Sequence, residues 1–187
     1  GSDKAFAAGA DIGTMATQTY MQAHQGDFIT RNWETIRQVR KPVIAAVAGF
    51  AMGGGCELAL ACDIIVAAES ARFALPEVKV GLAAMAGGVV RLAREIGPKQ
   101  ALGLALSGEA VTAAEAFRLG IVNEVTDGGA LEKAREWAGR LARIAPLYWL
   151  TCIAFLWVTD FAVLRAADGW LHALTHRVKG RMHQAAR

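Results

Sequence analysis

The chain has 187 residues, a length that suits one domain with a core large enough to bury most of its apolar surface. Hydrophobic residues make up 54% of the sequence and charged residues 20%, which excludes an intrinsically disordered protein. The net charge of +3 resides in residues 147–187, which hold 5 basic and 2 acidic residues, whereas residues 1–146 hold 15 of each. Because the body has no basic stripe interleaved with aromatic residues, we expect no nucleic-acid partner.

Three cysteines, Cys56, Cys62 and Cys152, form neither an even framework nor a CxxC pair. This usage favours free thiols in a reducing compartment, so we expect a cytoplasmic location. Cys56 is next to Glu57, but no histidine lies near it in the sequence to activate the thiol. Packing as a small apolar residue is therefore favoured over a role as nucleophile.

The first part of the chain mixes one strand with polar segments. Residues 3–12 begin as a strand and end in a small-residue turn at Ala8–Ala10, where another molecule can approach the backbone closely. Residues 13–33 are polar and irregular and predict helix ends around a mobile loop. A helix is predicted over Trp33–Val39, since its apolar residues recur at helical spacing.

The next segment predicts an α/β fold. Val43–Ala48 is an unbroken apolar run, typical of a strand buried on both faces. A wide glycine turn over Gly49–Gly55 and a short buried helix over Cys56–Cys62 follow it. Two further strands are predicted at Asp63–Ala67 and Arg72–Ala74. This succession indicates repeated ββα or βαβ units.

From Gly87 the sequence is mostly helical. Thr112 and Glu115 have the spacing of a capping box for a helix that ends at Gly120. Pro98 suits the first turn of a helix. The other elements predicted in this part are the helices Val89–Ile96 and Lys99–Leu106, a brief strand Ile121–Val125, and an amphipathic helix with Leu131, Ala134, Ala138 and Leu141 on one face.

Two glutamates, Glu57 and Glu77, are the candidate catalytic residues. Glu57 closes the run that begins with Gly53–Gly55, and Glu77 follows Pro76. Two carboxylates at one cavity suit acid/base chemistry beside a polarised carbonyl, and glycines that enter a helix leave N–H groups suited to an oxyanion. A P-loop is excluded because no Gly-Lys-Ser/Thr follows, and a Rossmann site because no acidic residue ends a suitable second strand. Tight packing is the alternative explanation of the glycines.

Several of these segments together resemble the crotonase (enoyl-CoA hydratase) superfamily. The likeness covers residues 3–146 and implies a spiral of ββα turns, assembled as trimers or dimers of trimers, that acts on acyl-coenzyme A thioesters. The residues that carry it are 5–12, 41–49, 53–59, 62–65, Phe73, Pro76-Glu77, Gly81-Leu82, Gly87-Gly88, Arg91-Leu92, 106–108 and 113–125.

The resemblance also implies a role for each site residue. The backbone N–H groups of Ala10 and Gly54 would form the oxyanion hole for the thioester oxygen. Glu57 would act as base on water, and Glu77 would deliver a proton to the α-carbon. The expected reaction is hydration of a trans-2-enoyl-CoA, with no metal and no cofactor apart from the coenzyme A of the substrate. The residues expected to line the substrate path are Ala8, Ala10, Asp11, Ile12 and Gly54.

The sequence departs from the family at Ala84-Met85, where typical hydratases have Pro-Gly. Met85 is bulky and leaves open another acyl-CoA reaction of the same fold, dehydration or isomerisation. A second alternative, a catalytically inactive truncated homologue, depends on the missing start and the unfamiliar tail. The first ββα turn of the family would lie before residue 1, so the spiral is expected to be incomplete at its start.

Residues 147–187 do not resemble the family's tail, so we predict a core at 1–146 and an atypical helical region at 147–187. A changed reading frame near residue 147 is one hypothesis, which translating the other frames of the source DNA would test.

The apolar run 147–164 contains Asp160, and a central Asp would cost a membrane span roughly 2.5–3.5 kcal/mol. We therefore expect no membrane span. His172 and His176 lack a third metal ligand.

Overall fold

The computed structural model describes residues 2–26, 33 and 35–144. The chain divides into two compact units, residues 1–138 and 139–187, and the second is described only over the helical residues 139–144. Of the segment 13–33, predicted as helix ends around a mobile loop, positions 27–32 lie outside the described residues, as does the region predicted at 147–187. The predicted domain boundary at residue 146 therefore stays a prediction.

Two sheets form the framework of the first unit. In both sheets neighbouring strands run parallel, except that β5 and β6 pair antiparallel. The four-stranded sheet has the order β1 (Ala5–Ala7), β3 (Phe50–Met52), β5 (Arg72–Ala74), β6 (Val111–Thr112). The three-stranded sheet has the order β2 (Ile44–Val47), β4 (Ile64–Ala68), β7 (Glu124–Thr126).

From β1 to β5 successive strands alternate between the two sheets, so that each turn of the chain adds one strand to each, whereas β6 follows β5 within the first sheet. In the second sheet Ile44 pairs with Ile64, and in the first sheet Phe50 pairs with Arg72. The chain thus returns to the neighbouring position after one β-β-helix unit. This arrangement confirms the predicted α/β class and its ββα turns.

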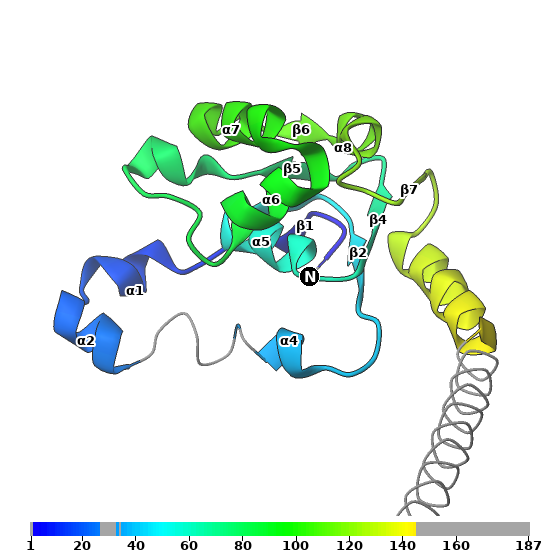
Figure 1. Cartoon of the computed structure of the whole chain (residues 1–187), viewed down its shortest axis with the longest axis horizontal. Helices are drawn as coiled ribbons and strands as arrows, with labels where there is room; N and C mark the ends of the chain where they lie inside the picture. Colours follow the sequence, from blue (N-terminus) through cyan, green and yellow to red (C-terminus); the bar gives the residue numbers. More distant parts are fainter. Residues whose placement is uncertain (1, 27–32, 34, 145–187) are drawn as a thin grey trace, which may run out of the picture. The chain divides into compact units, whose positions relative to one another are not determined.

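Helices α5 and α8 lie against the strands, and α6 lies against α5, with α6 and α7 side by side in Figure 1. The short helices α1, α2 and α4 contain no buried residue. Pro98 begins α7, as its fixed φ predicts, and residues 130–144 are also helical. The bounds are α1 (Ile12–Ala16), α2 (Tyr20–Gln25), α4 (Thr35–Gln38), α5 (Gly54–Leu60), the 3₁₀ helix η1 (Pro76–Val80), α6 (Gly88–Ile96), α7 (Pro98–Ser107) and α8 (Ala113–Leu119).

The prediction of one continuous turn over Gly49–Gly55 is wrong. Gly49 and Gly53 each have a positive φ, 64° and 54°, but the three residues between them form β3. Strand β3 pairs on both sides, with β1 and β5. Three residues between glycines are too short to show a strand pattern, and the pairing partners supply the stability instead.

The capping box predicted for α8 is only half formed. The Thr112 hydroxyl accepts a hydrogen bond from the Glu115 N–H at 3.2 Å, as predicted. The Glu115 carboxylate does not return to Thr112 and instead accepts two hydrogen bonds from Arg118. A guanidinium that can bind both carboxylate oxygens outcompetes a single backbone donor.

The core lies around the central strands and the helices packed on them. Val47 on β2 and Val66 on β4 are both completely buried. Ala59 on α5 and Ala116 on α8 are also inaccessible to solvent, and these small side chains let the helices lie close to the sheets. Among the described residues, no helix is long and apolar enough to cross a membrane.

Candidate active site

The site is built where three adjacent parallel strands end. Strands β1, β3 and β5 run in the same direction, so Ala8–Ala10, Gly53–Gly54 and Leu75–Glu77 leave the sheet at one edge. Ligands of α/β proteins bind in the crevice outside the carboxyl ends of such strands. The topology therefore brings together residues from three separate parts of the sequence.

The glycines at the end of β3 turn the chain sharply into α5. Gly53 takes a φ of 54°, and its N–H donates to the carbonyl of Ala74 at 2.9 Å, which extends the pairing of β3 with β5. Gly55 lies against β1 so closely that any Cβ would collide with the Ala7 carbonyl. Only glycine fits at these two positions. The packing alternative for the glycines is thus correct for Gly55, while Gly54 remains available to a ligand.

The two predicted oxyanion donors lie next to each other. A Cβ built on Gly54 would be 3.7 Å from the Ala10 nitrogen and 3.4 Å from the Gly9 Cα. Neither the Ala10 N–H nor the Gly54 N–H donates a hydrogen bond to a residue that the structure describes. Gly54 is also the first residue of α5, where the helix dipole favours negative charge. The pair has the chemistry of an oxyanion hole.

Glu57 is the only buried charged residue among those described, with 4% of its surface exposed. It projects from the first turn of α5, and its Oε1 accepts a hydrogen bond from the Gly88 N–H at 2.8 Å. Burial raises the pKa of Glu57, and the charge of Glu77 raises it further. Hydrogen bonds from Gly88 and Ala86 and the charge of Arg91 oppose that rise. A buried carboxyl with a raised pKa suits a general base.

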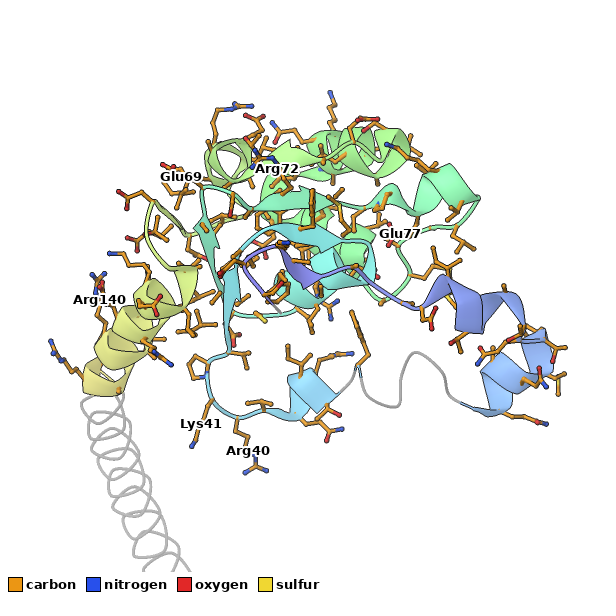
Figure 2. The ribbon with its side chains drawn as sticks, turned by 180° about the vertical axis from the view of Figure 1, so that it is seen from behind. Arg40, Lys41, Glu69, Arg72, Glu77 and Arg140 are labelled. Atoms are coloured by element: carbon orange, nitrogen blue, oxygen red, sulfur yellow. The ribbon has the colours of Figure 1, made fainter. Side chains whose placement is uncertain are left out.

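Glu77 approaches the same site from the end of β5 (Figure 2). Its Oε1 would be 3.0 Å from a Cβ on Gly53, so the carboxylate lies against the glycine turn. Its Oε2 is buried and has no hydrogen-bond partner among the described residues. Buried carboxylate oxygens without a partner are unusual, which leaves this oxygen available to a water molecule or a substrate.

Cys56 precedes Glu57 in α5 and is 4% exposed. Burial, followed by the charges of Glu77 and Glu57, raises the pKa of its thiol to about 12. Since the thiolate is the nucleophile, this thiol is unreactive at neutral pH. The prediction that Cys56 serves packing is confirmed.

The residues predicted to line the substrate path are accessible. Ala8, Ala10, Asp11 and Ile12 are all exposed just beyond β1. Asp11 caps α1, because its carboxylate accepts from the Gly13 N–H and the Thr14 hydroxyl, both at 2.9 Å, and these bonds lower its pKa. Contact of these residues with a ligand stays a prediction.

Nothing in the sequence indicated that Arg91 and Trp33 meet near Glu57. The Ala86 carbonyl accepts hydrogen bonds from Arg91 and from the indole N–H of Trp33. The two donors lie on different helical segments, and no motif connects them. Met85 precedes this carbonyl with 80% of its surface exposed, while Ala84 is buried. No group of three His, Cys, Asp or Glu among the described residues could hold a metal ion.

The fold and this constellation define the class of protein. The family model for enoyl-CoA hydratase/isomerase matches residues 1–153 of the chain. The chain therefore belongs to the enoyl-CoA hydratase/isomerase family, and the predicted membership of the crotonase superfamily is confirmed.

Individual relatives are similar over the same region. A probable enoyl-CoA hydratase of Mycobacterium leprae is 50% identical over 125 residues, which cover 67% of this chain and 48% of that protein. The 2,3-dehydroadipyl-CoA hydratase of Escherichia coli is 44% identical over 148 residues, which cover 79% of this chain and 58% of that protein. The crystal structure of an enoyl-CoA hydratase from Bacillus anthracis aligns with a TM-score of 0.71 at 40% identity, and the alignment covers 76% of this chain and 56% of that one. The chain spans about half the length of the curated relatives that it matches.

Proposed function

We propose that the chain provides the catalytic centre of an enoyl-CoA hydratase, a hydro-lyase that adds water across the double bond of a trans-2-enoyl-CoA. One observation carries this proposal. Glu57 is a buried carboxylate, and the Glu77 carboxylate has a buried oxygen without a hydrogen-bond partner among the described residues. Both lie at the glycine turn that holds the Ala10 and Gly54 N–H groups, which donate to no described residue. The hydratases among its relatives support the same reaction.

In the proposed reaction the thioester oxygen accepts hydrogen bonds from the N–H groups of Ala10 and Gly54. These donors withdraw charge from the β-carbon and stabilise the enolate. Glu57 removes a proton from water as the oxygen bonds to the β-carbon, and the π electrons move toward the thioester. Glu77 gives a proton to the α-carbon, and the proton that Glu57 takes from water is returned to Glu77 through solvent before the next turnover. Loss of water from a 3-hydroxyacyl-CoA is the same path in reverse.

The remaining properties are part of the proposal. The partner is an acyl-CoA thioester, and the coenzyme A of the substrate is the only coenzyme that this chemistry requires. We infer assembly as a homotrimer or hexamer in the cytoplasm. Exposed apolar side chains on several elements support assembly, among them Val80, Leu102, Leu106 and Phe117.

The test is turnover of crotonyl-CoA, followed by loss of the ultraviolet absorbance of the conjugated thioester. We expect Glu57→Gln and Glu77→Gln each to lower kcat by on the order of 10²–10⁴-fold, since each removes a proton-transfer group. Glu95→Gln, an exposed carboxylate on α6, is the matched control and should leave kcat unchanged.

Two results would contradict the proposal. The first is an intact, folded chain that does not hydrate crotonyl-CoA or longer enoyl-CoA thioesters. The second is turnover that survives both glutamine substitutions. Activity on a 3-enoyl-CoA in place of the conjugated substrate would favour the isomerase alternative.

A further inference from the structure

The Ala86 carbonyl is the meeting point of two side chains from distant parts of the sequence. Arg91 Nη1 donates a hydrogen bond to this oxygen at 2.8 Å, and Trp33 Nε1 donates another at 3.1 Å. Both donors are half-buried. The carbonyl belongs to the short segment that enters α6, and neither hydrogen bond is a part of the helix itself.

The same segment supplies the hydrogen bonds to Glu57. The Gly88 N–H donates to Glu57 Oε1 at 2.8 Å, and the backbone of Ala86 contributes a second hydrogen bond that lowers the pKa of the carboxyl. The backbones of Ala86 and Gly88 therefore bind Glu57, while the Ala86 carbonyl accepts from Arg91 and Trp33. The position of this segment determines where the Glu57 carboxylate points.

Steric contacts leave the segment little freedom. A Cβ on Gly88 would be 2.7–3.1 Å from three atoms of the Glu57 side chain. Gly87 has a φ of 100°, and a Cβ there would collide with the guanidinium of Arg91. The backbone is thus enclosed between Glu57 on one side and Arg91 on the other.

Trp33 also contacts the oxyanion side of the site. Its Cη2 would lie 3.7 Å from a Cβ on Gly54, an ordinary van der Waals distance. One indole therefore spans from the Gly54 backbone to the Ala86 carbonyl. It connects the predicted oxyanion donor with the segment that holds the predicted base.

We propose that Arg91 and Trp33 are positioning residues, which hold the Ala86 carbonyl so that the backbones of Ala86 and Gly88 aim Glu57 at its water. This inference rests on the proposed hydratase function. Neither side chain touches the reacting atoms in this role. Arg91 acts through charge as well as geometry, whereas Trp33 acts through geometry alone.

The experiment compares Arg91→Met, Arg91→Lys and Trp33→Phe in the full chain, with Arg94→Met as matched control, because Arg94 is an exposed arginine on the same helix. With crotonyl-CoA we expect Arg91→Met to lower kcat by on the order of 10²-fold and leave KM nearly unchanged, since the base is misplaced. Trp33→Phe keeps a ring but loses the N–H, and should lower kcat roughly fivefold, the equivalent of one hydrogen bond. Arg91→Lys should be intermediate.

A readout independent of turnover is the titration of the Glu57 carboxyl by ¹³C NMR, with the signal assigned by its loss in Glu57→Gln. The groups that face Glu57 are Glu77, Cys56 and Arg91. We expect the midpoint to rise in Arg91→Met and also in Trp33→Phe. Because Trp33→Phe removes no charge, a rise in that variant must act through the Ala86 segment.

The outcomes separate the two proposals. An inactive wild-type chain overturns the proposed function, while the NMR titration still decides the positioning role. The positioning role is overturned if the Glu57 titration midpoint is unchanged in Trp33→Phe. It is also overturned if the variants change KM and leave kcat unaltered. If Arg91→Met fails to fold, as judged by circular dichroism, the Trp33→Phe result decides alone.

Discussion

Gly9 is the residue through which the end of β1 reaches the proposed oxyanion hole. Its φ is 92°, and a Cβ on it would lie 3.1 Å from the Gly54 nitrogen and 3.2 Å from the Met52 carbonyl oxygen. A side chain there would strain the backbone and press against one of the two proposed donors. The absence of a side chain at residue 9 is therefore a condition for the distance between the Ala10 and Gly54 N–H groups.

We expect Gly9→Ala to lower kcat by about 10²-fold, which is typical of losing one oxyanion donor. The measured quantity is kcat for crotonyl-CoA, with Gly103→Ala as control, because Gly103 lies in α7, has no positive φ and a Cβ there would meet nothing within 4 Å. The folded state of each variant is checked by circular dichroism. Full activity in Gly9→Ala would show that the Ala10 and Gly54 donors do not act as a pair.

At the scale of elements, α8 offers a direct measure of how one side chain begins a helix. Thr112 accepts from the Glu115 N–H, whereas Glu115 and Arg118 form an exposed ion pair on the next turn. We expect Thr112→Ala to lower the free energy of unfolding by about 1 kcal/mol, and Thr112→Ser to restore most of it. Glu115→Gln should have a smaller effect, since exposed ion pairs contribute little. Urea denaturation measures all three, and a larger loss in Glu115→Gln would contradict the half-formed cap.

The sequence predicted those elements that have their own local signal. Pro98 indicated the start of α7, and the apolar run at 43–48 indicated a buried strand that the structure places at Ile44–Val47. Strand β6 was missed because its two residues depend on pairing with β5. The helical turn at Pro76–Val80 was missed for a similar reason, since five residues carry no periodicity.

The candidate site was only partly predictable for the same physical reason. Glu57 and Glu77 stand out because each is a carboxylate in an otherwise apolar or turn-forming context. Arg91 and Trp33 act through a backbone carbonyl, and a carbonyl has no signature in a sequence. Only the folded chain brings the Trp33 indole to the Ala86 carbonyl, which is 53 positions away in the sequence.

At the scale of the whole molecule, the site and the stability of the fold make opposite demands on Glu57. The core around α5 is apolar, with Cys56, Ala59 and Leu60 buried beside this carboxyl. Burying an ionised group there is unfavourable, and this explains why its pKa is raised above the ordinary value of 4.5. Catalytic groups of this kind are maintained at the expense of stability.

The linked pH dependence has a definite sign. At a pH below the pKa that Glu57 has in the unfolded chain, the carboxyl carries its proton in both the folded and the unfolded state. Its neutral form then contributes its full share of stability. That contribution is lost as pH rises from about 4.5 through the higher folded pKa, because the unfolded chain then binds fewer protons than the native one. Glu57→Gln cannot ionise. We therefore expect this variant to be stabilised relative to wild type, by a margin that is smallest at pH 4 and grows until Glu57 is fully ionised in the folded state.

Each unit by which folding raises the Glu57 pKa corresponds to about 1.4 kcal/mol of this difference. The measurement is the free energy of unfolding of wild type and Glu57→Gln from urea denaturation between pH 4 and pH 8, with Glu95→Gln as an exposed control. Glutamine retains an oxygen that can accept from the Gly88 N–H, so this hydrogen bond need not be lost. A difference that does not change with pH would mean that folding leaves the Glu57 pKa unaltered, and the carboxyl would then lack the environment of a base held in an apolar site.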